Sequence, residues 1–225
     1  LRPEHTTPTE GAFFEPMTVS LHTMQLAGGC EGKEVIIVGA GTIGLLAMQC
    51  AKALGARSVT AIDINPERLA LSQKLGADYT FNSAEMTAVE IRTAMDSRRF
   101  DQLVLETAGS PQTVELSIQI AGPQAQIGLI STLHRDLPLS SSTFGLILRK
   151  ELRILGSWMN YSGQWPGVEW QQAVRLFEQG SIDLSSLIAV QAAPQDYAQA
   201  VSALAGKPMS GKIMLDFSVT DKEQA

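Results

Sequence analysis

The stretch Val35-Ile36-Ile37-Val38-Gly39-Ala40-Gly41-Thr42-Ile43-Gly44 decides the fold of this chain. Four consecutive β-branched residues predict a strand that is buried on both faces. Apolar residues then recur with the period of a helix, at Ile43, Leu46, Ala47, Cys50, Ala51 and Leu54. Residues 35–51 carry no charge, but this run is shorter than the roughly 20 residues of a membrane span, and glycines interrupt it. We therefore expect a buried strand, a glycine turn and a helix rather than a membrane segment.

The glycines of this turn have the spacing G-x-G-x-x-G, which is typical of dinucleotide-binding sites. Gly39 permits a tight turn, Gly41 lets the backbone approach a pyrophosphate, and Gly44 lets the helix pack close to the strand. The free N–H groups at the start of the helix would face the phosphates. We expect Gly39, Gly41, Thr42, Ile43 and Gly44 to bind a nucleotide cofactor; the alternative is a simple packing turn.

Asp63 follows a second predicted strand, residues 58–62, and lies 19 residues after Gly44. This spacing is typical of a carboxylate that accepts hydrogen bonds from the adenosine ribose. A 2′-phosphate at that position would be repelled, so Asp63 favours NAD over NADP. Arg68 could accept a 2′-phosphate, but we expect it to stack on the adenine or to pair locally.

The same alternation continues along the chain. Further strands are predicted at residues 77–81, 103–105, 126–130 and 154–158, with helices at 66–75, at 84–95 and from Ser110-Pro111 onward. Six strands alternating with helices indicate an α/β fold, a doubly wound Rossmann sheet of six parallel strands. Beyond residue 158 a helix (168–179), a strand (187–190), a helix (195–205) and a strand (212–217) are predicted. Residues 1–10 are expected to be irregular and residues 220–225 to be frayed.

Composition excludes several classes of function. The chain has 225 residues, a net charge of −6 and 44% hydrophobic residues, which is enough apolar material for a core and argues against a nucleic-acid partner. Cys30 and Cys50 lack metal-type spacing. Because no secretion signal is evident, we expect a cytoplasmic protein without a membrane partner.

Glu15-Pro16, Val19 and His22, followed by the glycine motif, Asp63 and Arg68, resemble the zinc-dependent medium-chain dehydrogenases of the polyol dehydrogenase group. In that family the cofactor domain is inserted into a GroES-like catalytic domain. The resemblance implies that residues 1–17 end the catalytic domain, 18–158 form the NAD-binding domain, and 159–225 return to the truncated catalytic domain. Most of that domain would then lie outside this chain.

The resemblance also implies roles for single residues. Glu15 would be a ligand of a catalytic zinc, with the other ligands outside this chain, although by itself it is only a charged residue before a turn. His22 is expected to be a satisfied, half-buried helix residue. Ile130, Ser131 and Thr132, after the fifth strand, would lie against the nicotinamide half of the cofactor, with Ser131 where a glycine is common. No catalytic residue or proton relay is identified.

The implied function is NAD- and zinc-dependent oxidation of a small sugar-alcohol phosphate to a keto sugar phosphate, by a homodimer or homotetramer. This chain alone is expected to be inactive. One alternative is a zinc-free medium-chain reductase, which would not use Glu15 as a ligand. Another is a non-catalytic nucleotide-sensing domain, which would have no reason to carry the elements between residues 168 and 217.

Overall fold

The computed structural model of the chain describes residues 3, 5–95, 101–204 and 210–217. Its centre is a six-stranded sheet in the order β3-β2-β1-β4-β5-β6, in which every neighbouring pair is parallel. The strands are β1 (Glu34–Val38), β2 (Ser58–Asp63), β3 (Tyr79–Asn82), β4 (Gln102–Glu106), β5 (Gln126–Leu129) and β6 (Arg153–Gly156). The prediction of a doubly wound sheet of six parallel strands is confirmed.

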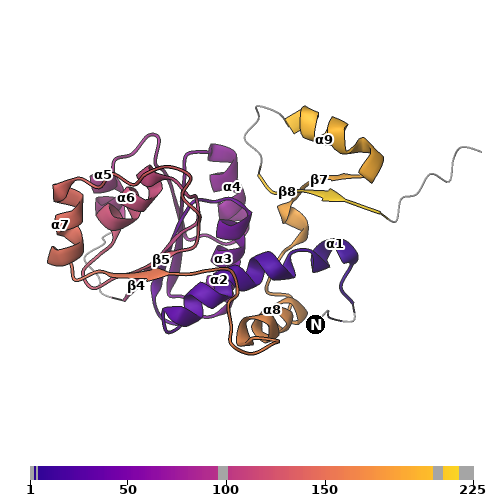
Figure 1. The fold of residues 1–225 in the computed structure, drawn as a ribbon, viewed down its shortest axis with the longest axis horizontal. Coiled ribbons are helices and arrows are strands. Elements are labelled where there is room, and N and C mark those ends of the chain that lie inside the picture. Colours follow the sequence, from indigo (N-terminus) through magenta and orange to yellow (C-terminus); the bar gives the residue numbers. More distant parts are fainter. Residues whose placement is uncertain (1–2, 4, 96–100, 205–209, 218–225) are drawn as a thin grey trace, which may run out of the picture.

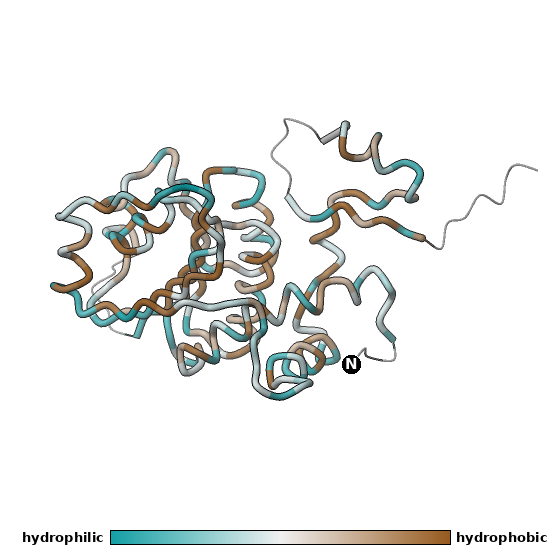
Figure 2. Tube along the Cα trace, viewed as in Figure 1, coloured by the Kyte–Doolittle hydropathy of each residue, from teal (hydrophilic) through white to brown (hydrophobic). Residues whose placement is uncertain are grey.

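Helices cover both faces of this sheet (Figure 1). They are α3 (Thr42–Ala53), α4 (Pro66–Lys74), α5 (Ala88–Ala94), α6 (Pro111–Ile120) and α7 (Ser141–Arg149). Side chains of β1 alternate between two cores: Val35 and Ile37 pack with α3, and Ile36 and Val38 pack with α5 and α6. Figure 2 shows the apolar character that runs along these central strands. The carboxyl ends of the strands are therefore held on a rigid base.

Two helices outside the strand–helix alternation pack on the α3 side. The long α2 (Phe14–Leu26) follows the short α1 (Pro8–Gly11), and α8 (Val168–Glu178) lies against it, with the rings of Phe14 and Phe177 5.3 Å apart at their centroids. Ser20 donates from its hydroxyl to the carbonyl oxygen of Ile43 at 3.3 Å. The contact ties α2 to the first turn of α3, next to the glycine turn.

The C-terminal part forms a separate two-stranded parallel sheet of β7 (Ile188–Ala192) and β8 (Lys212–Leu215), with α9 (Tyr197–Leu204) between the strands (Figure 1). Short 3₁₀ turns, η1 (Ser185–Leu187) and η2 (Pro194–Asp196), precede β7 and α9. The helix predicted at 195–205 is thus a 3₁₀ turn followed by α9, and Ala205 lies outside the described residues. The last strand ends at Leu215, not Phe217, and the predicted frayed end, 220–225, is also outside the described part.

Several boundaries differ from the predictions for local reasons. The helix predicted from residue 84 begins at Ala88, because Thr87 caps it and Glu90 completes a capping box. The unpredicted α7 is capped by Ser140, whose side chain accepts from the N–H of Thr143. α1 lies partly within the stretch expected to be irregular, and β6 ends two residues before Trp158. Within the described residues no helix is long and apolar enough to cross a membrane.

Candidate functional site

The glycine turn joins β1 to α3, and two of its glycines are required by packing. Gly39 has a φ of +104°, and a Cβ there would lie 2.8 Å from the Cβ of Ala108. A Cβ on Gly44 would overlap the carbonyl oxygen of Gly39. These glycines let β1, α3 and the loop after β4 approach one another closely.

Gly41 is different, because no packing contact with the described part of the chain requires a glycine there. Its φ is −73°, an ordinary value, and among the described residues, its two chain neighbours aside, no atom lies within 4 Å of a Cβ built at this position. Gly41 is also the N-cap of α3 and supplies no side-chain cap. The N–H groups in the first turn of α3, which begins at Thr42, therefore have no side-chain cap, and the space beside Gly41 is open among the described residues. Such a helix start fits a phosphate group.

Asp63, the last residue of β2, is only 7% exposed and fixes the turn from the neighbouring strand. Its Oδ2 accepts from the N–H of Ala40 at 2.7 Å, and its Oδ1 accepts from the N–H of Asn65 at 2.9 Å. A carboxylate has about four lone-pair sites, so Asp63 can accept further hydrogen bonds. The sequence did not reveal the bond to Ala40, which joins residues of two different strand ends.

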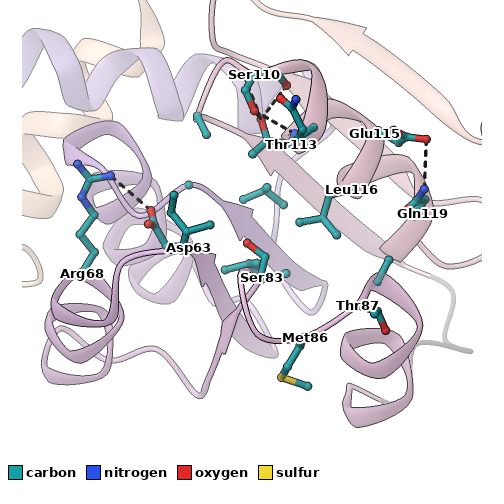
Figure 3. A pocket seen from close by; sticks show the side chains of 17 residues that line it. Asp63, Arg68, Ser83, Met86, Thr87, Ser110, Thr113, Glu115, Leu116 and Gln119 are labelled. Atoms are coloured by element: carbon teal, nitrogen blue, oxygen red, sulfur yellow. Dashed lines mark hydrogen bonds and ion pairs between the residues drawn. The ribbon is translucent and has the colours of Figure 1, made fainter. Parts of the chain in front are cut away.

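Arg68 pairs with Asp63 at the mouth of a cleft. Its Nη1 lies 3.6 Å from Oδ2 of Asp63, which is the local pairing considered from the sequence. The cleft has a volume of about 660 Å³ and lies between the ends of β1 and β2 on one side and α5 and α6 on the other. Figure 3 shows Asp63 and Arg68 across the cleft from Ser110, Thr113 and Leu116 of the α6 segment. The open glycine turn and this cleft together fit a dinucleotide.

The structure adds one residue that the sequence did not single out. Glu106, the last residue of β4, is 1% exposed, and its carboxylate accepts from the N–H groups of Ala108 (3.0 Å) and Gly109 (2.9 Å) and from the hydroxyl of Ser131. The residues after β5, Ile130, Ser131 and Thr132, therefore lie beside the loop after β4. An acidic residue directly after the apolar run 103–105 was the available signal.

Glu15 lies in the first turn of α2 and its side chain is exposed. Its carbonyl oxygen accepts from the hydroxyl of Thr18 at 2.7 Å, and that hydroxyl accepts from Nδ2 of Asn160 at 2.8 Å. The turn that carries Glu15 is thus joined to the loop after β6. His22, expected to be half-buried, is buried at 8% exposure.

The described residues do not form a metal centre by themselves. Nowhere in this part of the chain do three or more His, Cys, Asp or Glu side chains gather as a metal ion would require. A zinc site usually needs at least three protein ligands. Glu15 alone does not make a zinc site.

Comparisons with known proteins agree with this architecture. A family model described as zinc-binding dehydrogenase matches residues 42–179. Galactitol 1-phosphate 5-dehydrogenase of Escherichia coli (strain K12) is 58% identical over 206 residues, which are 92% of this chain and 60% of that protein. The chain thus spans about 60% of the length of this relative.

Solved structures show the same similarity. The crystal structure of galactitol-1-phosphate dehydrogenase from Escherichia coli has a TM-score of 0.90 and 57% identity, covering 95% of this chain and 62% of that one. A crystal structure from Sinorhizobium meliloti 1021 that holds NADP has a TM-score of 0.75 and 26% identity, over 94% of this chain and 59% of that one. From the match over residues 42–179 and these similarities, the chain belongs to the zinc-binding dehydrogenase family.

Proposed function

We propose that this chain is the NAD-binding part of an NAD- and zinc-dependent dehydrogenase that oxidises a sugar-alcohol phosphate, such as galactitol 1-phosphate, to a keto sugar phosphate. The observation that carries the proposal is the glycine turn, in which Gly41 leaves an uncapped helix start open beside Asp63. The identity of 58% with galactitol 1-phosphate 5-dehydrogenase supports the substrate class.

In this proposal the chain binds and orients the cofactor. The backbone N–H groups at Thr42 and Ile43 hold the pyrophosphate, and the remaining lone pairs of Asp63 accept from the ribose hydroxyls. A nicotinamide held in this way would supply the hydride acceptor that oxidation of the substrate alcohol requires. Ile130, Ser131 and Thr132 contact its nicotinamide half.

The preference between the two nicotinamide cofactors follows from charge. The Asp63 carboxylate would repel a 2′-phosphate, and Arg68, at 3.6 Å, offsets part of that charge. Arg68 is already paired with Asp63, which makes it a poorer partner for a 2′-phosphate than an arginine without such a neighbour. NAD is therefore the proposed cofactor, although a relative at 26% identity holds NADP.

The division into residues 1–17, 18–158 and 159–225 is proposed on the family resemblance. α2 crosses the first boundary as one helix, so the turn that carries Glu15 and the NAD-binding part are joined without a flexible linker. Glu15 is proposed to supply one zinc ligand, with the others from residues outside this chain. A homodimer or homotetramer is proposed for the whole enzyme. The buried free thiols of Cys30 and Cys50 agree with a cytoplasmic location.

The cofactor proposal is tested by isothermal titration of the full-length protein with NADH and with NADPH. We expect the wild-type protein to bind NADH at least about ten-fold more tightly, a difference of about 1.4 kcal/mol. Asp63→Asn removes the charge and keeps one oxygen that can accept from the N–H of Ala40 or of Asn65. The preference is a ratio of two affinities of the same variant, and it should be mostly lost. Equal affinity of the wild-type protein for both nucleotides would contradict the assignment of NAD.

The substrate and the metal are tested separately in the full-length protein. NADH formation is measured with galactitol 1-phosphate and with galactitol, and we expect the phosphorylated substrate to react faster. Glu15→Gln should lower the zinc content per subunit, whereas Glu31→Gln, which changes another exposed glutamate, should not. A zinc content that Glu15→Gln leaves unchanged would exclude Glu15 as a ligand.

A further inference from the structure

The ends of β4 and β5 meet around the side chain of Glu106. Its Oε1 accepts from the N–H groups of Ala108 and Gly109 in its own loop, and its Oε2 accepts from the hydroxyl of Ser131 in the loop after β5. The carbonyl oxygen of Glu106 also accepts from the N–H of Ile130 at 3.1 Å. One residue therefore fixes both loops at the rim of the site.

Packing leaves these loops little freedom. Gly109 has a φ of +76°, and a Cβ there would lie 2.9 Å from the carbonyl oxygen of Thr132 and 3.3 Å from the Cβ of Ser131. On the other side, Thr107 donates from its hydroxyl to the carbonyl oxygen of Gly39 at 2.7 Å. The glycine turn, the loop after β4 and the loop after β5 thus form one continuous rim.

A carboxylate this deeply buried depends on its hydrogen-bond donors. Two of the donors to Glu106 are backbone groups that exist whatever the side chains are, whereas the third is the hydroxyl of Ser131. Ser131 is therefore the point at which a side-chain change alone would loosen the loop after β5 from β4. Because Glu106 is 1% exposed, it acts on a ligand through these loops rather than by contact.

We propose that Glu106, acting through Ser131, is a positioning residue that holds residues 130–132 in place for the nicotinamide half of the cofactor. This inference rests on the proposed function, in which those residues line that half of the site. The adenosine half lies at Asp63 and Arg68, on the other side of β1 in the strand order. A change at Ser131 should consequently affect one half of the cofactor and not the other.

The test compares two probes on the full-length protein by isothermal titration. NADH occupies both halves of the site, and 5′-AMP occupies the adenosine half alone. We expect Ser131→Ala to weaken NADH binding about ten-fold, since one hydrogen bond to a charged group is removed, and to leave 5′-AMP binding within about two-fold. Glu106→Ala should weaken NADH binding at least as much.

Two further variants separate positioning from general damage. Glu106→Gln can still accept from Ala108 and Gly109, and its amide can donate to Ser131, so it should retain NADH affinity within about two-fold. The double variant Glu106→Ala/Ser131→Ala should bind NADH no more weakly than Glu106→Ala, because both changes break the same link. Thermal melts identify any variant that fails to fold; Ser131→Ala and Glu106→Gln then decide the question.

The inference is overturned if Ser131→Ala binds NADH as tightly as the wild-type protein, if it weakens NADH and 5′-AMP equally, or if the losses from the two alanine changes add. The wild-type protein binding neither nucleotide would overturn the proposed function, and this inference with it. Tight NADH binding by the wild-type protein together with any of the first three results would overturn the inference alone.

Discussion

Gly41 and Gly44 give a sharp prediction, because the same substitution to alanine should impair different properties at the two positions. At Gly41 it should weaken NADH binding, and three residues later, at Gly44, it should lower the stability of the fold. Gly41→Ala places its methyl group in space that is open within the described structure, and φ is already −73°. Alanine is a poorer N-cap than glycine by a few tenths to about 1 kcal/mol. Replacing glycine by alanine also lowers the conformational entropy of the unfolded chain, which stabilises the folded protein by about 0.4–1 kcal/mol. The free energy of unfolding should change by less than about 0.5 kcal/mol.

NADH binding by Gly41→Ala should nevertheless fall at least about ten-fold, because the methyl group occupies the space through which the pyrophosphate reaches the helix N–H groups. Gly44→Ala, unlike Gly41→Ala, should clearly lower the free energy of unfolding. Its methyl group overlaps the carbonyl oxygen of Gly39, which is backbone and cannot rotate away. Overpacking of this kind lowers the free energy of unfolding by about 1–3 kcal/mol.

Urea unfolding of both variants, followed by circular dichroism, and titration with NADH provide the two readouts. A Gly41→Ala protein that is as stable as the wild type and also binds NADH with unchanged affinity would refute the reasoning, since the open helix start would then not be the pyrophosphate site. A marked loss of stability in Gly41→Ala would show that packing, not a ligand, requires this glycine.

Three other predictions concern stability and thiol reactivity. Lys150 donates from Nζ to the carbonyl oxygens of Ile118, Gln119 and Ala121 at the end of α6, so Lys150→Met should lower the free energy of unfolding by about 1–3 kcal/mol. Burial, with the nearby charge of Arg92, lowers the pKa of Lys150 to about 8. Between about pH 8 and 10.5 the unfolded chain therefore binds more protons at this residue than the folded chain, so the free energy of unfolding of the wild-type protein, relative to Lys150→Met, should increase with pH in that range. A decrease in that range would contradict the lowered pKa. Partial burial by itself raises the pKa of Asp78, but the hydrogen bonds from Lys52 and the N–H of Val59 outweigh it, and the net pKa is lowered. In urea unfolding at pH 7 the wild-type protein should therefore be slightly more stable than Asp78→Asn, and this difference should disappear as the pH falls below about 4. A difference in stability that increases as the pH falls would contradict the lowered pKa. Burial raises the pKa of both Cys30 and Cys50, so a thiol reagent such as DTNB should label neither in the native protein and both in denaturant; rapid native labelling would show that one is accessible.

The elements that the sequence predicted well are those whose structure is decided by residues close together in the chain. The run Val35–Val38 could only be a buried strand, and the glycines after it had to form its turn, so β1, α3 and the place of Asp63 were predictable. The caps at Asn65 and Ser110 also placed the starts of α4 and α6. In these cases residues a few positions apart decide the structure.

The rest depends on contacts between distant segments. Whether Asp63 would bond to Ala40, or Glu106 to Ser131, depends on which strand ends become neighbours in the sheet. The start of α5 was missed although Thr87 and Glu90 form a recognisable capping box, because apolar residues before it extended the helical pattern. α7 was missed although Leu146 and Ile147 pack against the core, because Phe144 and Leu148 are exposed and the apolar residues therefore do not share one buried face.

The two buried carboxylates at the rim have a thermodynamic consequence for recognition. Asp63 accepts from the N–H groups of Ala40 and Asn65, and Glu106 accepts from those of Ala108 and Gly109, so both partners of every one of these bonds belong to the chain itself. The backbone at the edge of the cleft is therefore ordered before a ligand arrives. Binding then loses little conformational entropy at these loops, so more of the interaction energy is expressed as affinity. The rim is built as a preformed receptor, with the same backbone expected in its free and occupied states.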